Sequence, residues 1–106
     1  CFVLCIIRVY SRLLVVVSAH LPNSFSFTAA EYSASLAELQ AALDSARRSY
    51  PTAHFIFGMD ANVQLDCRLA NHEDLIGPSV SDRRIESSRA DEFVHFSLIN
   101  NLCLLN

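Results

Sequence analysis

Two short polar segments, each directly after an apolar stretch, hold the side chains best suited to chemistry. The first segment is Ser18–Asn23 and the second is Phe57–Asn62. Asp60 and Asn62 lie two residues apart, so on extended backbone their side chains point to the same side. A carboxylate there can accept a proton or bind a metal ion, and an amide can donate to an anionic oxygen. With the His20 imidazole as a further donor, the set predicts a site for phosphate chemistry.

Each of these residues also has an ordinary structural interpretation. Asp and Asn are typical of turns that follow a strand, which applies to Asp60 and Asn62. A histidine at the end of a strand, such as His20, is often only structural. Asn23 follows a proline, as turn residues do, and its functional alternative is contact with the substrate. His54 precedes an apolar stretch, and we interpret it as structural.

The elements that must hold these side chains begin with three apolar runs. Phe2–Ile7, Leu13–Ala19 and His54–Met59 are short and continuously apolar, which predicts strands buried on both faces. Residues 8–12 would connect the first two strands. Pro22 ends the second strand because proline has no N–H to donate to a neighbour.

A long amphipathic helix is predicted between the second and third strands. Thr28 and Glu31 have the spacing of a capping box, and Pro51 disfavours helix at the residue before it. Asp44 and the basic residues near position 48 occupy the polar side. The apolar side is a single stripe at helical spacing: Tyr32, Leu36, Leu39, Leu43, Ala46 and Tyr50.

A shorter helix and a fourth strand are predicted near the carboxyl terminus, after an irregular region from 61 to 88. Ser88 and Asp91 form a second capping box, the helix ends near residues 100–101, and 102–105 would begin a strand. The resulting order of elements predicts a mixed α/β (α+β) sandwich. The expected apolar positions of the helix are Phe93, Val94, Phe96, Leu98 and Ile99.

Composition excludes several classes of protein. The chain has 106 residues, of which 52% are hydrophobic, and a formal net charge of −3. This much apolar surface excludes a disordered tail, and the charge disfavours a dedicated basic nucleic-acid module. Arg83, Arg84 and Arg89 form one local basic cluster, interpreted either as a solvated loop or as a contact for phosphates.

Cysteine usage favours a reducing, intracellular compartment. The four cysteines stand singly, as small buried hydrophobic residues do, and Cys67 with His72 lacks two further ligands for zinc. The apolar run of residues 1–22 contains Arg8 and Arg12, and each central arginine opposes membrane insertion by about 2.5–3.5 kcal/mol. We therefore expect no membrane partner. The cysteines are Cys1, Cys5, Cys67 and Cys103.

Three segments, with the helix between the first two, resemble a known family. "VVVSAHLPNS", "PTAHFIFGMDANVQL" and "RADEFVHFSLINNLCLLN" look like the middle of the endonuclease/exonuclease/phosphatase (deoxyribonuclease-I-like) superfamily. The stretch around Asp60 resembles that family's Gly-Asp-x-Asn motif with one residue inserted after the glycine. Among its branches, the closing pattern is most similar to the LINE-type retrotransposon endonucleases. The resemblance implies a four-layer α/β/β/α sandwich, of which residues 1–106 are the central part, truncated at both ends.

The resemblance also implies roles for four residues. Asp60 would orient or deprotonate the attacking water and contact Mg²⁺, and Asn62 would hold the scissile phosphate and contribute to the metal site. His20 matches a position that donates to a phosphate oxygen in several branches. Asn23 would contact the substrate backbone. The implied partner is nucleic acid, with DNA favoured, and the implied activity is endonucleolytic cleavage of phosphodiester bonds.

Departures from the family pattern leave alternatives open. The family's upstream Asn and metal-binding Glu would precede Cys1, its closing Ser-Asp-His would follow Asn106, and His95 lies within a predicted helix. We therefore expect the isolated chain to be inactive, because metal and general base must be positioned together. The intact protein could instead be an inositol-phosphate or phospholipid phosphatase, or a non-catalytic remnant of a mobile element.

Overall fold

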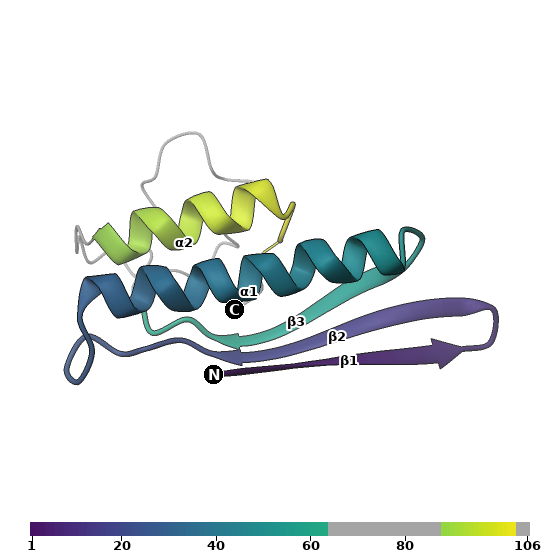
Figure 1. Cartoon of the computed structure of the whole chain (residues 1–106), viewed down its shortest axis with the longest axis horizontal. Coiled ribbons are helices and arrows are strands. Elements are labelled where there is room, and N and C mark those ends of the chain that lie inside the picture. Colours follow the sequence, from purple (N-terminus) through teal and green to yellow (C-terminus); the bar gives the residue numbers. More distant parts are fainter. Residues whose placement is uncertain (64–87, 104–106) are drawn as a thin grey trace. The chain divides into compact units, whose positions relative to one another are not determined.

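The computed structural model describes residues 1–63 and 88–103. The chain divides into two compact units, residues 1–62 and residues 63–106. The first unit holds all the strands of the described residues and one helix, and the second holds the other helix (Figure 1). In chain order the elements are β1 (Phe2–Val9), β2 (Arg12–His20), α1 (Ala29–Ser49), β3 (His54–Asp60) and α2 (Ser88–Ile99).

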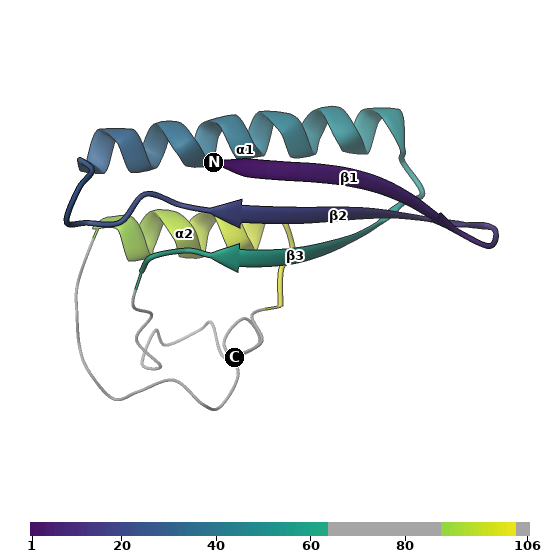
Figure 2. The ribbon, with the colours of Figure 1, turned by 90° about the horizontal axis from the view of Figure 1, so that it is seen from below.

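The strands form one mixed sheet in the order β1-β2-β3 (Figure 2). β1 and β2 are antiparallel and joined by a tight turn at Tyr10, whose φ is 54°, so Arg8 and Arg12 belong to strands rather than to the expected longer connection. β2 and β3 are parallel, and α1 makes the crossover between them. The carboxyl ends of parallel strands lie at the same edge of a sheet. At this edge His20, the last residue of β2, pairs with Asp60, the last residue of β3.

The capping box predicted for α1 is present. The Thr28 hydroxyl accepts from the Glu31 backbone N–H at 3.2 Å, and the Glu31 carboxylate accepts from the Thr28 N–H at 2.7 Å. Five of the six predicted stripe positions are buried, and the sixth, Tyr50, is the half-buried residue that ends the helix. The buried positions are Tyr32, Leu36, Leu39, Leu43 and Ala46.

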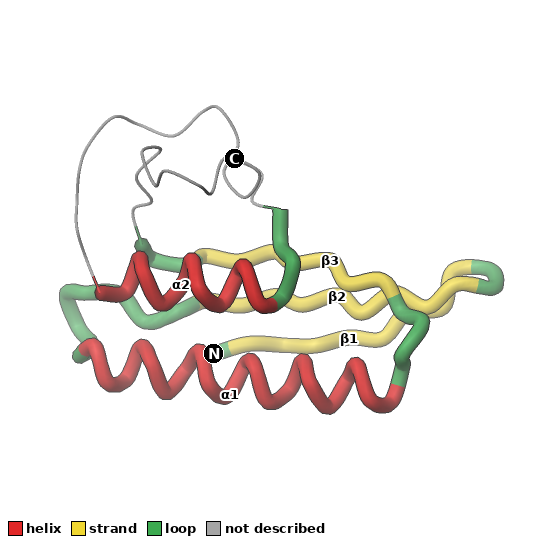
Figure 3. Tube along the Cα trace, turned by 90° about the horizontal axis from the view of Figure 1, so that it is seen from above, coloured by secondary structure: helices red, strands yellow, loops and turns green. Residues whose placement is uncertain are grey.

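The helix α1 lies on one side of the sheet and runs antiparallel to β3 (Figures 1 and 3). Near its start the Tyr32 hydroxyl reaches the Ala61 carbonyl after β3, and near its end the Arg47 guanidinium lies over the Phe55 ring at the beginning of β3. On this covered face, Val15 and Val17 of β2 are fully buried. The apolar stripe of the helix therefore builds the core with the inward positions of the strands.

The opposite face of the sheet is apolar but exposed, so the expectation of strands buried on both faces is wrong for this unit. In residues 1–62 the single helix covers one face, and alternate strand residues leave the other face to solvent. Continuous apolar runs show that both faces are hydrophobic, but they cannot show that both are covered. We call this surface the open face, and its exposed members include Val3, Ile7, Val9 and Ile56.

Helix α2 of the second unit differs from expectation at its start and in which of its residues are buried. It already includes Ser88, which was predicted to precede it, and Leu98 and Ile99 are exposed instead of buried. Ser97 is buried, and its hydroxyl is satisfied by donating to the Phe93 carbonyl at 2.8 Å. The helix ends at Ile99, directly before the expected end near residues 100–101, and Asn101 follows in the turn with a φ of 52°.

Some predictions fall where little or nothing is described. Residues 64–87 and 104–106 lie outside the described residues, including Cys67, His72 and the pair Arg83–Arg84. Leu102 and Cys103, predicted to begin a strand, are not in one. Across the described ranges, no helix is long and apolar enough to cross a membrane. The small mixed sheet with two helices confirms an α+β fold.

Candidate functional site

The carboxyl ends of β2 and β3 bring two predicted site residues together. His20 and Asp60 are register partners, and the Leu21 N–H donates to the Asp60 carbonyl at 2.9 Å. On the other side of β2, His20 and Cys1 bond through their backbones, so β2 is held from both sides at this point. Register partners of a parallel pair project from the same face. Both side chains therefore belong to the open face.

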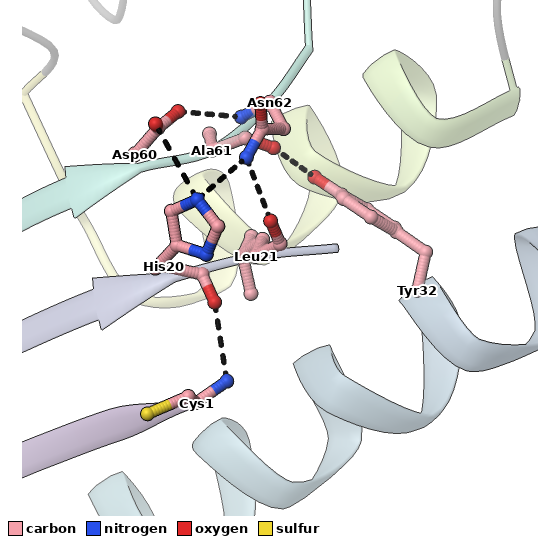
Figure 4. A network of polar contacts seen from close by, with 7 residues as sticks. All are labelled: Cys1, His20, Leu21, Tyr32, Asp60, Ala61 and Asn62. Carbon is pink, nitrogen blue, oxygen red and sulfur yellow. Dashed lines mark hydrogen bonds and ion pairs between the residues drawn. The ribbon is translucent and has the colours of Figure 1, made fainter. Parts of the chain in front are cut away.

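The side chains of His20, Asp60 and Asn62 meet at this edge (Figure 4). His20 Nε2 lies 3.7 Å from Asp60 Oδ2 and 3.3 Å from Asn62 Nδ2. The imidazole and the carboxylate are each 63% exposed, so an incoming ligand can reach both. The predicted convergence of an aspartate, an asparagine and a histidine is therefore present in the structure.

Asn62 occupies a conformation that few residue types adopt easily. Its φ is 48°, in the left-handed region, where asparagine is tolerated better than most residues. Its backbone N–H donates to Asp60 Oδ1 at 3.1 Å, which closes a turn directly after β3. This turn carries the Asn62 amide back toward β2, where Nδ2 donates to the Leu21 carbonyl at 2.8 Å. A strand-end turn and the site are therefore one structure.

The contact with Leu21 fixes how the Asn62 amide is oriented. A carbonyl oxygen only accepts, so the atom that faces it must be the NH₂ group. The second hydrogen of that group points to His20 Nε2, which therefore accepts and leaves the ring hydrogen of neutral His20 on Nδ1. Both amide hydrogens are then occupied, and Asn62 Oδ1 is the atom available to a ligand. For Asn62 Nδ2 to contact a phosphate, it must first break its contact with His20 Nε2.

The oxygen atoms of the site suit a hard divalent cation that keeps much of its own water. Asp60 offers a carboxylate and Asn62 an amide oxygen, and Mg²⁺ is commonly held by one or two carboxylates with water and phosphate. No group of three or more His, Cys, Asp or Glu side chains gathers as a metal cage within residues 1–63 or 88–103. Asp60 and Asn62 are therefore the residues of this site that could hold Mg²⁺ together with a phosphate.

Tyr32 supports the site from the core, and sequence reasoning assigned it only to the helix stripe. Its ring is fully buried on α1, and its hydroxyl donates to the Ala61 carbonyl at 3.0 Å. Ala61 is the residue between Asp60 and Asn62, so this bond ties the site turn to the helix. The signal was the residue type, because a tyrosine in an apolar stripe needs a partner for its hydroxyl when buried.

The other predicted polar residues have different surroundings. Asn23 Oδ1 accepts from the N–H groups of Phe25 and Ser26, at 3.1 and 2.9 Å, so this side chain shapes the loop after β2. Its contact with a substrate stays a prediction. His54 is exposed at the start of β3, the opposite end of the strand from Asp60, and His95 is exposed on α2. Neither of these two histidines is among the residues of the network in Figure 4.

Comparison of the chain with protein-family models, curated proteins and solved structures found no match. The resemblance to the endonuclease/exonuclease/phosphatase superfamily therefore remains a proposal. What the structure contributes is local and specific: three polar side chains from two strand ends, joined by contacts of 3.3 and 3.7 Å, on an exposed edge of the sheet.

Proposed function

We propose that this chain is part of a Mg²⁺-dependent phosphodiesterase, an endonuclease that hydrolyses phosphodiester bonds in nucleic acid. The observation that carries the proposal is the convergence of His20, Asp60 and Asn62 at the carboxyl ends of β2 and β3. The imidazole nitrogen Nε2 lies 3.7 Å from an exposed carboxylate and 3.3 Å from an amide nitrogen, and this set of groups matches the needs of hydrolysis at phosphorus. This is a site for an anion that has access from solvent.

Each residue has a task that its contacts support. The Asp60 carboxylate accepts a proton from, or orients, the attacking water. Asn62 orients the neutral imidazole through the 3.3 Å contact and presents Oδ1 outward. His20, once protonated and turned away from the Asn62 NH₂ group, donates from Nε2 to a non-bridging phosphate oxygen and so stabilises the charge that develops there. Tyr32 holds the turn in place through Ala61 and acts as a positioning residue.

Mg²⁺ would be held by Asp60 and Asn62 Oδ1, together with groups from outside this chain. When bound, the ion neutralises phosphate charge and polarises the P–O bonds. The resemblance places the principal carboxylate ligand, and a further histidine, in flanking sequence. The proposal therefore concerns the intact protein, and we expect residues 1–106 alone to be inactive.

The proposed fold of the intact protein is the four-layer α/β/β/α sandwich of the family. The open face supports it, because a sheet that is hydrophobic on both sides is stable when a second sheet or helix layer covers the exposed side. In this arrangement α1 forms an outer layer and the open face lies at the centre. The site would then lie at one end of the paired sheets.

The experiment that tests the function is cleavage by a protein that contains this chain with its native flanking sequence. Supercoiled plasmid and single-stranded oligonucleotides are incubated with Mg²⁺ or with EDTA, and products are separated on gels. We expect Asp60→Asn and His20→Ala each to lower the cleavage rate at least about 100-fold, the range typical of a lost acid–base group. EDTA abolishes cleavage of both substrates.

The matched control is His54→Ala, which removes an exposed histidine from the other end of β3. It should cleave like the unmodified protein. Cleavage that Asp60→Asn leaves unchanged would contradict the proposed site. Hydrolysis of inositol phosphates or phospholipids in place of nucleic acid would overturn the substrate, and no Mg²⁺-dependent hydrolysis of any of these would identify a non-catalytic remnant.

A further inference from the structure

The loop between β2 and α1 extends beyond the edge of the sheet that carries the site (Figure 1). It spans residues 21–28 and is fixed at both ends. At the first end the Leu21 N–H bonds to the Asp60 carbonyl, and at the second end Thr28 forms the capping box of α1. A loop held in this way, with its first residue bonded at the site, presents its middle residues in a defined position.

The middle of this loop is shaped by Asn23 and presents an aromatic ring to solvent. Asn23 Oδ1 accepts from two consecutive N–H groups, those of Phe25 and Ser26, which turns the chain within the loop. The Phe25 side chain is 98% exposed. Single exposed apolar residues are common, but this one stands on a loop braced against the site. Its ring face is free for a flat apolar partner.

We infer that Phe25 is a stacking platform for an unpaired base of single-stranded nucleic acid whose phosphate lies at the His20–Asp60–Asn62 site. This inference rests on the proposed function and adds the form of the substrate. Phe25 comes five positions after His20, so the Cα atoms of the two residues lie at most about 18 Å apart. That distance is the reach of a few nucleotides. Single strands expose base faces that a duplex keeps stacked, and every base offers one to an aromatic ring.

Binding of a short oligonucleotide with 2-aminopurine near its centre tests the inference. The protein of the cleavage experiment is used with Ca²⁺ in place of Mg²⁺, and anisotropy and 2-aminopurine fluorescence are measured. We expect Phe25→Ala to raise the Kd about 5- to 100-fold and to remove the fluorescence quenching that stacking causes. Phe25→Trp should retain both binding and quenching. Tyr10→Ala is the matched control, since Tyr10 is 96% exposed but lies in the turn between β1 and β2.

A second oligonucleotide, abasic across the same central positions, isolates stacking from other effects of the loop. The unmodified protein should bind the abasic oligonucleotide more weakly than the first one, by about the factor by which Phe25→Ala raises the Kd for the first. The Phe25→Ala protein should bind both oligonucleotides equally. If the Phe25→Ala and unmodified proteins bind the first oligonucleotide equally, the inference is overturned. Phe25 would then be available for contact with a protein partner. A loss that is the same for both oligonucleotides would also overturn the inference. Asp60→Asn could fail to reduce cleavage while Phe25→Ala still weakens binding only when the central bases are present. That pair of results would overturn the proposed function alone.

Discussion

Asn62 shows how a backbone conformation and a site can depend on one side chain. Its φ of 48° carries the chain back over the end of β3, and its amide then bridges Leu21 and His20. Glycine would adopt this φ without strain but has no amide, and alanine has neither advantage. The two effects can therefore be separated by substitution.

We predict that Asn62→Ala is less stable than Asn62→Gly, although glycine is usually the more destabilising residue. Both variants lose the 2.8 Å bond to Leu21, but only alanine also meets the strain of the left-handed region. The difference in free energy of unfolding should be about 0.5–1 kcal/mol, measured by urea denaturation. Equal stability, or a more stable alanine variant, would show that residue 62 changes its φ when substituted.

At the scale of elements, α1 is the part that brings β2 and β3 into register. The two strands are parallel, so the chain must cross over between them, and the capping box at Thr28 determines where the helix begins. The hydroxyl of Tyr32, one turn later, donates to the carbonyl of Ala61, the residue directly after β3. The start of the helix is therefore coupled to the position of Asp60 and Asn62.

We predict that Thr28→Ala lowers the free energy of unfolding by about 1 kcal/mol, because it removes the side chain that accepts from the Glu31 N–H. Ser35→Ala is the control on the same helix. The Ser35 hydroxyl only bonds back to the Glu31 carbonyl, and alanine is the better helix former, so this change should be neutral or slightly stabilising. Thermal denaturation followed by circular dichroism measures both. A Thr28→Ala variant as stable as the unmodified chain would show that the cap contributes little.

At the scale of the whole molecule, the open face is the feature that most needs a partner. Many strand residues on this side are apolar and exposed, and no helix of residues 1–62 lies over them. Exposed apolar sheets associate with one another when nothing covers them. We therefore expect the 106-residue chain to associate with itself in solution and to express poorly in soluble form.

The test of this expectation uses two isoleucines of equal exposure. Ile56 on the open face is 52% exposed, and Ile99 on α2 is 53% exposed. Ile56→Lys should increase the fraction of monomer in sedimentation velocity runs over a range of concentrations, and Ile99→Lys should change it little. A monomeric unmodified chain with a sharp two-state melt, or equal effects of both substitutions, would contradict a self-associating open face.

Sequence patterns predicted much of this structure where the signal is local. The strands, the capped helix and the convergence of His20 with Asp60 all follow from short motifs and from the way parallel strands end together. The sequence patterns did not predict the features that depend on contacts between residues far apart in the chain. Tyr32 was assigned to the core without its bond to Ala61, and Leu98 was expected to be buried. Periodicity also cannot report whether an apolar sheet face is covered, because coverage depends on residues elsewhere in the protein.

The parallel pairing of β2 with β3 makes the site a reporter of complete folding. The β1–β2 hairpin contains His20 but neither Asp60 nor Asn62, and these two reach His20 only where β3 is paired with β2. A ligand that needs all three residues binds the finished unit and no partly folded form. By thermodynamic linkage, such a ligand at 100 times its Kd would raise the stability of the unit by about 2.7 kcal/mol. Substitutions in α1 that never touch the ligand would then weaken its apparent affinity through the population of docked β3.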